Sequence, residues 1–199
     1  LLTDAFAKKL CAFAQNGGTV IVTYWSGVVD ESDLCRLGDT PYGLTELLGL
    51  RRTEIDGMYD GETRRCMPAA GCTLPAAQAS TLCEVAALDE ENPAEPLSLY
   101  DEDYFAGHPA VAVHRYGKGR AYYLASRFDE AFYRAFYHDA AKEIGLSPAW
   151  PEALPEGVLA VRRGSFVFVQ NCTEQPVTVG NTVLERYRTA VWKDMDRIF

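Results

Sequence analysis

Near the start of the chain, a stretch with helical spacing of apolar residues is followed by a continuous apolar run. Residues 2–15 carry apolar side chains every three or four positions, which predicts a helix with Thr3 or Asp4 as its N-cap. Asn16-Gly17-Gly18 follow, and these residues tolerate the left-handed backbone that ends a helix. TVIVTY, residues 19–24, is typical of a strand buried on both faces of a parallel sheet. Helix, Gly-Gly and strand form the second half of a βαβ unit, so we expect its first strand upstream of residue 1.

The middle of the chain has weaker patterns. Thr40 and Pro41 predict the N-cap and first position of a second helix that ends at Gly49. The remaining expectations are a strand at 50–57, a long Gly-, Pro- and Ala-rich loop at 58–79, a strand at 81–89 and a polar turn at 90–96.

Two later segments have clear periodicity. Residues 110–125 read AVAVHRY, GKG and RAYYLA, which predicts a β-hairpin with a three-residue turn. Residues 128–145 place apolar side chains at every fourth position, which predicts a helix. Its aromatic rings favour packing against a sheet over a cofactor-binding box, because their spacing is that of a buried helix face.

A boundary between two domains is expected at residues 146–157, which contain three prolines and no periodicity. Beyond it, a hairpin around Gly164-Ser165 should place Phe166 and Phe168 on one face, with valines on the other. Short strands follow, which is typical of a small antiparallel domain. We therefore expect an α/β domain over 1–147 and a small β domain over 148–199.

Composition and charge exclude several classes of partner. The 199 residues are 48% hydrophobic and carry a net charge of −9, which favours a packed core and argues against nucleic-acid or anionic-membrane partners. No run of 18 apolar residues occurs. The start, LLTDAFAKKL, has no initiator Met and no signal-peptide pattern, as expected for a piece of a longer protein. We expect its six cysteines to be reduced and mostly buried, and the location to be cytoplasmic.

The search for catalytic chemistry gives no site. Ser26 follows the first strand, but a nucleophile elbow needs glycine where this chain has Tyr24 and Val28. Cys72 lacks the second glycine of such an elbow. Three histidines and six cysteines show no zinc-ligand spacing, and the acidic clusters lack a calcium-loop pattern. We therefore predict no catalytic residue, no metal and no cofactor within this chain.

Residues 16–50, NGGTVIVTYWSGVVDESDLCRLGDTPYGLTELLGL, resemble the non-catalytic middle domain of glycoside hydrolase family 42 β-galactosidases. Residues 108–126 are similar to a later hairpin of that domain, and residues 154–179 are similar to the small C-terminal β domain of the family. Residues 186–199 depart from the family's usual apolar ending. The positions that match the first motif are Thr23, Tyr24, Ser26, Gly27, Asp30, Glu31 and Asp33.

The resemblance implies a Rossmann-like domain related to class I glutamine amidotransferases, with a mainly parallel sheet, that mediates homotrimer formation. It also implies a parent enzyme that cleaves terminal β-galactosides with retention, using two glutamates on a (β/α)₈ barrel upstream of residue 1. We expect the loop after the first strand to contact a neighbouring subunit or the barrel, through Tyr24, Trp25, Ser26, Asp30 and Asp33.

Two other functions stay open at this point. One is an amidotransferase-like hydrolase with an unrecognised nucleophile, for which Cys72 and Cys35 are the candidates. The other is a carbohydrate-binding module that stacks sugars on Trp25, Trp150 or Trp192.

Overall fold

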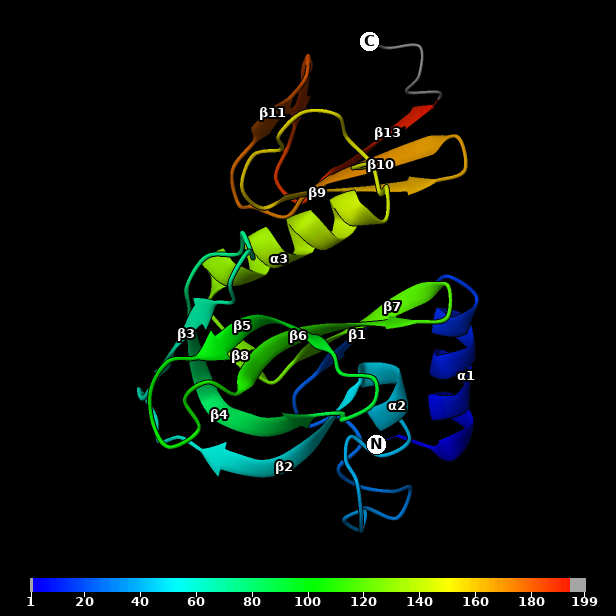
Figure 1. Ribbon diagram of the computed structural model, residues 1–199. Helices are drawn as coiled ribbons and strands as arrows, with labels where there is room; N and C mark the ends of the chain where they lie inside the picture. Colours follow the sequence, from blue (N-terminus) through cyan, green and yellow to red (C-terminus); the bar gives the residue numbers. More distant parts are fainter. Residues whose placement is uncertain (1, 194–199) are drawn as a thin grey trace. The chain divides into compact units, whose positions relative to one another are not determined.

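The computed structural model describes residues 2–193 of the chain, which forms two compact units, Leu1–Ala140 and Ala141–Phe199 (Figure 1). The first unit is built around one sheet, with helices α1 and α2 and most of α3. Its elements are α1 (Asp4–Gln15), β1 (Thr19–Thr23), α2 (Thr45–Leu48), β2 (Leu50–Gly57), β3 (Arg64–Pro68), β4 (Ala77–Leu88), β5 (Glu95–Tyr100), β6 (Pro109–Tyr116), β7 (Gly119–Leu124), β8 (Ser126–Phe128) and α3 (Glu130–Glu143).

Helix α1 and strand β1 form as the sequence predicts. The Thr3 hydroxyl accepts a hydrogen bond from the Phe6 N–H at 3.3 Å and so caps α1. The helix ends before Gly17, whose φ of +107° is a conformation that favours glycine. Val20 and Val22 are buried on one face of β1, while Ile21 on the other face is half-buried and packs against the core, so the expected burial on both faces is only partly met.

The sheet is mixed rather than mainly parallel, which corrects the predicted fold class. Its order is β1-β7-β6-β5-β3-β4-β2, and β8 also pairs with β4. Only β1 and β7 pair in parallel among the described strands, and the other pairs are antiparallel. The reason is connectivity: most consecutive strands are joined by short segments, which can reverse the chain but cannot supply a parallel crossover.

The sheet curls and closes on itself, because β8 pairs with β4. Strand β8 continues β7 after Ala125 and pairs with β4, which is also joined to β7 through β3, β5 and β6. The Tyr100 hydroxyl sits inside this closure and lies 3.4 Å from the Glu84 carbonyl oxygen and 3.3 Å from that of Ala125. Strands far apart in sequence are thereby brought around one core.

The middle of the chain differs most from expectation. The predicted loop at 58–79 contains β3 and the start of β4, and β5 begins inside the predicted polar turn at 90–96. The second helix is only α2, which starts after Leu44, while Thr40 precedes it and pairs with Arg52. Its predicted end at Gly49 is confirmed, with a left-handed φ of +61°. Strands β3 and β5 pair with each other, so their stability comes from contacts that local pattern does not show.

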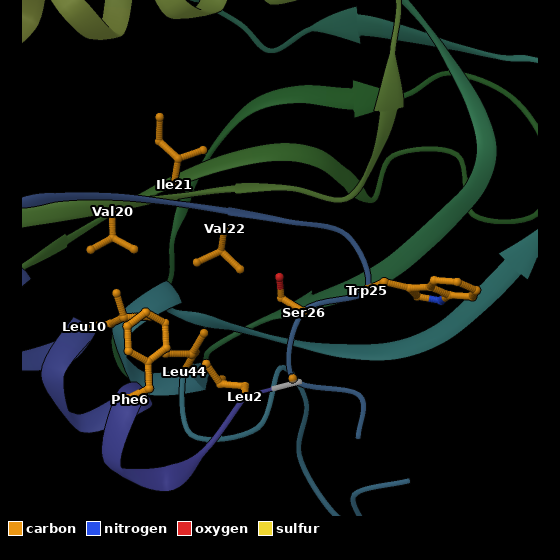
Figure 2. Close-up of a pocket in the computed structure, with 10 residues that line it drawn as sticks. Leu2, Phe6, Leu10, Val20, Ile21, Val22, Trp25, Ser26 and Leu44 are labelled. Atoms are coloured by element: carbon orange, nitrogen blue, oxygen red, sulfur yellow. The ribbon is translucent and has the colours of Figure 1, made fainter. Parts of the chain in front are cut away.

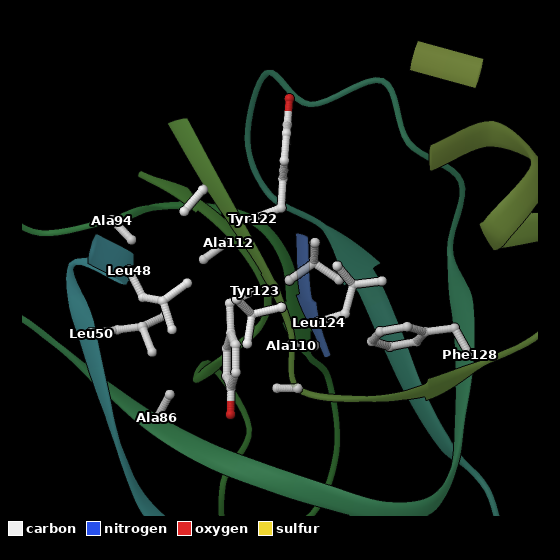
Figure 3. Packing of buried hydrophobic residues seen from close by; sticks show 14 of the residues in the cluster. Leu48, Leu50, Ala86, Ala94, Ala110, Ala112, Tyr122, Tyr123, Leu124 and Phe128 are labelled. Atoms are coloured by element: carbon white, nitrogen blue, oxygen red, sulfur yellow. The ribbon is translucent and has the colours of Figure 1, made fainter. Parts of the chain in front are cut away.

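The predicted hairpin and the aromatic helix are confirmed. Tyr116 pairs with Gly119, so the turn has two residues, Gly117 and Lys118, rather than three. Tyr122 and Tyr123 are both buried and point to opposite faces of β7, which shows that both faces are covered (Figure 3). Phe136 of α3 packs edge-on against Tyr122, with ring centroids 5.3 Å apart. The regularly spaced aromatic residues of α3 therefore pack in the core.

The second unit contains β9 (Val158–Arg163), β10 (Phe166–Asn171), β11 (Val177–Val179), β12 (Thr182–Leu184) and β13 (Thr189–Lys193). One sheet has the order β13-β10-β9, and β11 pairs with β12. The hairpin at Gly164-Ser165 and the alternation along β10 are confirmed, because Phe166 and Phe168 are exposed while Val167 and Val169 are buried. The end of the segment 186–199, beyond residue 193, lies outside the described residues.

Candidate functional site

The loop after β1 begins with an unusual backbone turn. Trp25 has a φ of +62°, a left-handed conformation that is uncommon for a residue other than glycine, and its side chain is 62% exposed. Gly27 also has a positive φ, and a Cβ there would lie 2.6 Å from the Tyr42 backbone nitrogen. Two constraints therefore shape this turn, a strained tryptophan and a glycine that no side chain can replace without movement.

A buried carboxylate holds this turn in place. Glu84 of β4 has no exposed surface, and its Oε1 atom accepts hydrogen bonds from the Trp25 N–H at 3.0 Å and from the Arg52 guanidinium at 2.7 Å. The Tyr123 hydroxyl donates to the other oxygen. Burial raises the pKa of Tyr123 well above its usual value and the charge of Glu84 raises it further, so this phenol stays a donor.

The acidic part of the loop folds on itself. The Asp30 carboxylate accepts the N–H groups of Ser32 at 2.8 Å and of Leu34 at 3.1 Å, and Val29 pairs with Cys35. Asp33 is exposed and has a φ of +60°. Asp30 therefore has a local structural role, as expected for an aspartate that starts a turn, while Asp33 lies at the surface.

Arg36 ties the end of this loop to helix α1. Its guanidinium lies 3.1 Å from the Asp4 carboxylate and 3.3 Å from the Leu2 carbonyl oxygen, and stacks over the Tyr42 ring at 3.9 Å. These contacts hold the Arg36 end of the loop to the body of the first unit, and the hydrogen bond to Glu84 holds the Trp25 end.

An apolar pocket of about 370 Å³ lies beside the turn (Figure 2). Helix α1 and strand β1 supply half of its lining residues, and among the described lining residues only Ser26 has a side-chain hydroxyl. The Trp25 ring points away from the Val20 and Val22 side chains (Figure 2). Among the described residues that line this pocket there is no acidic, basic or thiol side chain, so none of them could act as a base for Ser26.

The cysteines are not arranged as nucleophiles. Cys35 is exposed and Cys72 half-buried, and of the six thiols, none of them in a disulfide, only Cys66 and Cys83 are buried. The expectation of mostly buried thiols is therefore wrong. Burial raises the pKa of Cys66 to about 12 and that of Cys83 to about 11, which keeps both in the unreactive thiol form. Within residues 2–193, no cluster of three His, Cys, Asp or Glu side chains could hold a metal ion.

Two of the three tryptophans proposed as sugar platforms belong to the core of the second unit. Trp150 is buried, and Trp192 packs edge-on against it with ring centroids 5.1 Å apart. Only Trp25 presents a largely exposed ring. The carbohydrate-binding hypothesis is therefore wrong for Trp150, which is buried, and stays a prediction for Trp192, which is half-buried.

The structure brings Tyr24, Trp25 and Ser26 together at the carboxyl end of β1, with Asp30 and Asp33 further along the same loop. Sequence reasoning missed Glu84, Arg52 and Arg36. One signal was present, since Glu84 is a lone charge in the apolar strand LCEVAAL. A charge within a buried strand calls for a partner, although the sequence does not say which one.

The fold is that of a mixed α/β domain followed by a small antiparallel β unit. The family model described as "Beta-galactosidase trimerisation domain" matches residues 1–147, and the chain belongs to this family, the trimerisation domain of glycoside hydrolase family 42. In that family the domain is a non-catalytic part of the enzyme.

Curated relatives and solved structures agree with this assignment. β-Galactosidase BglY of Alicyclobacillus acidocaldarius is 44% identical over 182 residues, covering 88% of this chain and 26% of the relative. β-Galactosidase Pbg of Clostridium perfringens is 35% identical, covering 90% of this chain and 27% of the relative. The structure of the Rahnella sp. R3 β-galactosidase matches with a TM-score of 0.82 and 36% identity, over 96% of this chain and 30% of that one.

The chain thus spans about a quarter of the length of the curated relatives it matches. None of the helices within residues 2–193 is long and apolar enough to cross a membrane.

Proposed function

We propose that this chain is the assembly module of a longer family 42 β-galactosidase and that it joins three copies of that enzyme. The observation that carries this proposal is the match of the trimerisation-domain family over residues 1–147, together with 44% identity to a β-galactosidase. The substrate, a terminal β-galactoside, and the two catalytic glutamates would belong to a barrel outside these residues.

Within the module, we propose that Tyr24, Trp25, Ser26, Asp30 and Asp33 form a contact surface toward a neighbouring subunit or the barrel. Three features support a contact role: the exposed indole, its left-handed backbone and the buried carboxylate that holds this backbone. Strained and over-determined residues of this kind cluster at functional surfaces. Tryptophan is also among the residues that dominate binding energy at protein interfaces.

The test is the solution mass of the full-length enzyme with Trp25→Ala, measured by light scattering over a dilution series. We expect the concentration at which the trimer dissociates to rise about tenfold or more, because an interface tryptophan commonly contributes 2 kcal/mol or more. Tyr59→Ala is the matched control, since Tyr59 is an 83% exposed aromatic residue outside the loop. If Trp25→Ala changes neither the dissociation curve of the trimer nor the kinetics of the enzyme, the contact proposal is wrong.

Three finer expectations belong with this function. The helix–Gly-Gly–strand unit α1–β1, with β1 parallel to β7, supports an amidotransferase-like origin of the domain. Free cysteines support a reducing compartment such as the cytoplasm. The domain boundary after residue 147 is supported by the end of the family match.

A further inference from the structure

The three-stranded sheet of the second unit carries large apolar side chains on both faces. On one face, Val167 and Val169 of β10 are buried in a cluster with Trp150 and with Val179 and Leu184 of the β11–β12 hairpin. On the other face, five exposed side chains are large and apolar, and the exposed polar side chains of Gln170 and Thr189 lie beside Leu159 at one end. The five apolar side chains, here called the outer face, are Leu159, Val161, Phe166, Phe168 and Val191, with Arg163 and Lys193 at the other end.

The strand register shows that the outer face is one continuous patch. Phe168 lies directly between Val161 of β9 and Val191 of β13. Phe166, the next residue on this face, lies between Arg163 and Lys193, and the Lys193 ammonium lies 5.9 Å from its ring centroid. An antiparallel sheet that meets water on one face normally carries polar side chains there. A row of large apolar side chains across that face is instead typical of a sheet covered on both sides.

From this patch we propose that the outer face docks onto the part of the same polypeptide that lies outside these 199 residues. Under the proposed function, on which this inference rests, that part is the catalytic barrel. The second unit would then contact the catalytic barrel directly. The cationic end of the face, Arg163 and Lys193, calls for an acidic patch on the docking surface.

Length and area both favour this occupant. The chain covers 26–30% of its relatives and of the solved structure, so most of such a polypeptide lies outside it. Three strands of five or six residues present a face of roughly 300 Å² from strand spacing and rise. A stable contact between separate molecules buries about 800 Å² on each partner. A face this small suits a contact within one chain, where the linker keeps the local concentration high.

The experiment places the photo-crosslinker p-benzoylphenylalanine at position 168 of the full-length enzyme. We expect a product with the mass of one chain, in which residue 168 is joined to a peptide outside the present 199 residues. A product with the mass of two chains, a crosslink confined to these 199 residues, or no crosslink would each overturn the proposal. The same crosslinker at position 183, an exposed valine on β12, is the matched control and should give no such product.

A second variant separates docking from general proximity. Val191→Lys, directly opposite position 168, should lower the crosslink yield about tenfold, because docking would bury an unpaired charge. Val183→Lys should leave the yield unchanged, and equal losses for the two variants would contradict the proposal. Light scattering of the same samples reports trimer formation separately, so a monomer that still crosslinks would reject the proposed assembly function alone.

Discussion

The Oε1 atom of Glu84 lies 3.0 Å from the backbone nitrogen of Trp25, so a carboxylate with no exposed surface fixes the backbone of a largely exposed tryptophan. The two residues are 59 positions apart in sequence. The same oxygen accepts from Arg52, whose side chain is only 6% exposed. Buried charges of this kind are costly to dehydrate, and their retention is often linked to specifying one conformation. Here the conformation specified is the turn that presents Trp25.

The first prediction concerns this buried pair. Arg52→Met should lower the free energy of unfolding by about 3–5 kcal/mol, because it leaves the Glu84 charge buried without its ion-pair partner. Arg52→Met combined with Glu84→Gln should cost at least about 1 kcal/mol less than the two single changes added together. Urea unfolding measures all three variants.

The control for this cycle is an exposed pair. Arg134 and Glu130 of α3 form an ion pair with side chains 75% and 77% exposed, and the corresponding variants should cost less than about 1 kcal/mol. Additive costs in the buried pair would show that Arg52 and Glu84 do not act together.

The second prediction concerns the turn at Gly27. Gly27→Ala should destabilise the protein by about 1–3 kcal/mol more than Gly38→Ala, as judged by urea unfolding. Both glycines have a positive φ, but only at Gly27 does a Cβ meet backbone, at 2.6 Å from the Tyr42 nitrogen. At Gly38 the space is open. If the two variants lose equal unfolding free energy, the positive φ alone explains why glycine is needed at position 27, and the close approach to Tyr42 does not contribute.

The third prediction concerns acid stability. Asp129 caps α3, and its carboxylate accepts the N–H groups of Phe132 at 3.0 Å and of Gln78 at 2.8 Å. Burial raises the pKa of Asp129, but these hydrogen bonds outweigh it and lower the pKa overall. The folded value is then below the unfolded value near 4, so this stabilisation is complete above pH ~4 and is lost as the pH falls through the folded pKa.

The variant Asp129→Ala should therefore lose about 1 kcal/mol at pH 7 and show a shallower loss of unfolding free energy between pH 5 and 3. Thr3→Ala removes the neutral cap of α1 and is the control. It should lose a similar amount without changing the pH dependence. If Asp129→Ala leaves the pH dependence of the unfolding free energy unchanged, the Asp129 cap is not the source of the stabilisation that is lost in acid.

The fourth prediction concerns thiol reactivity. In native protein at pH 7, a thiol-specific reagent should label the exposed Cys35 and Cys172 quickly and leave Cys66 and Cys83 unlabelled until unfolding. Cys35→Ser should remove one of the fast phases. A thiol that reacts faster than free cysteine near pH 6 would revive the hypothesis of a cysteine nucleophile.

Several elements could be predicted from sequence because local pattern decides them. Helix α1 has its Thr3 cap and Gly17 stop within one stretch, and the β6–β7 hairpin has its turn glycines between two apolar runs. Phe132 and Phe136 of α3 repeat at helical spacing and are buried. The motif at residues 16–50 gave the family, which the family comparison confirms.

The candidate site could be predicted only in part. The loop after β1 was found because a strand end followed by Tyr24 and Trp25 is visible in sequence. The residues that hold this loop could not be predicted, because Glu84 and Arg52 come from different strands and meet only in the folded sheet. Cross-strand partners carry no fixed sequence separation, so a lone charge in a strand does not reveal them.

The sequence by itself determined the local elements, the family and the absence of a nucleophile elbow at Ser26, because each depends on neighbouring residues. Only the tertiary structure decided the direction of strand pairing, the strands β3 and β5, and the burial of Glu84 with its hydrogen bond from the Trp25 backbone. These features depend on residues brought together from distant parts of the chain, where pairing and packing override local propensity.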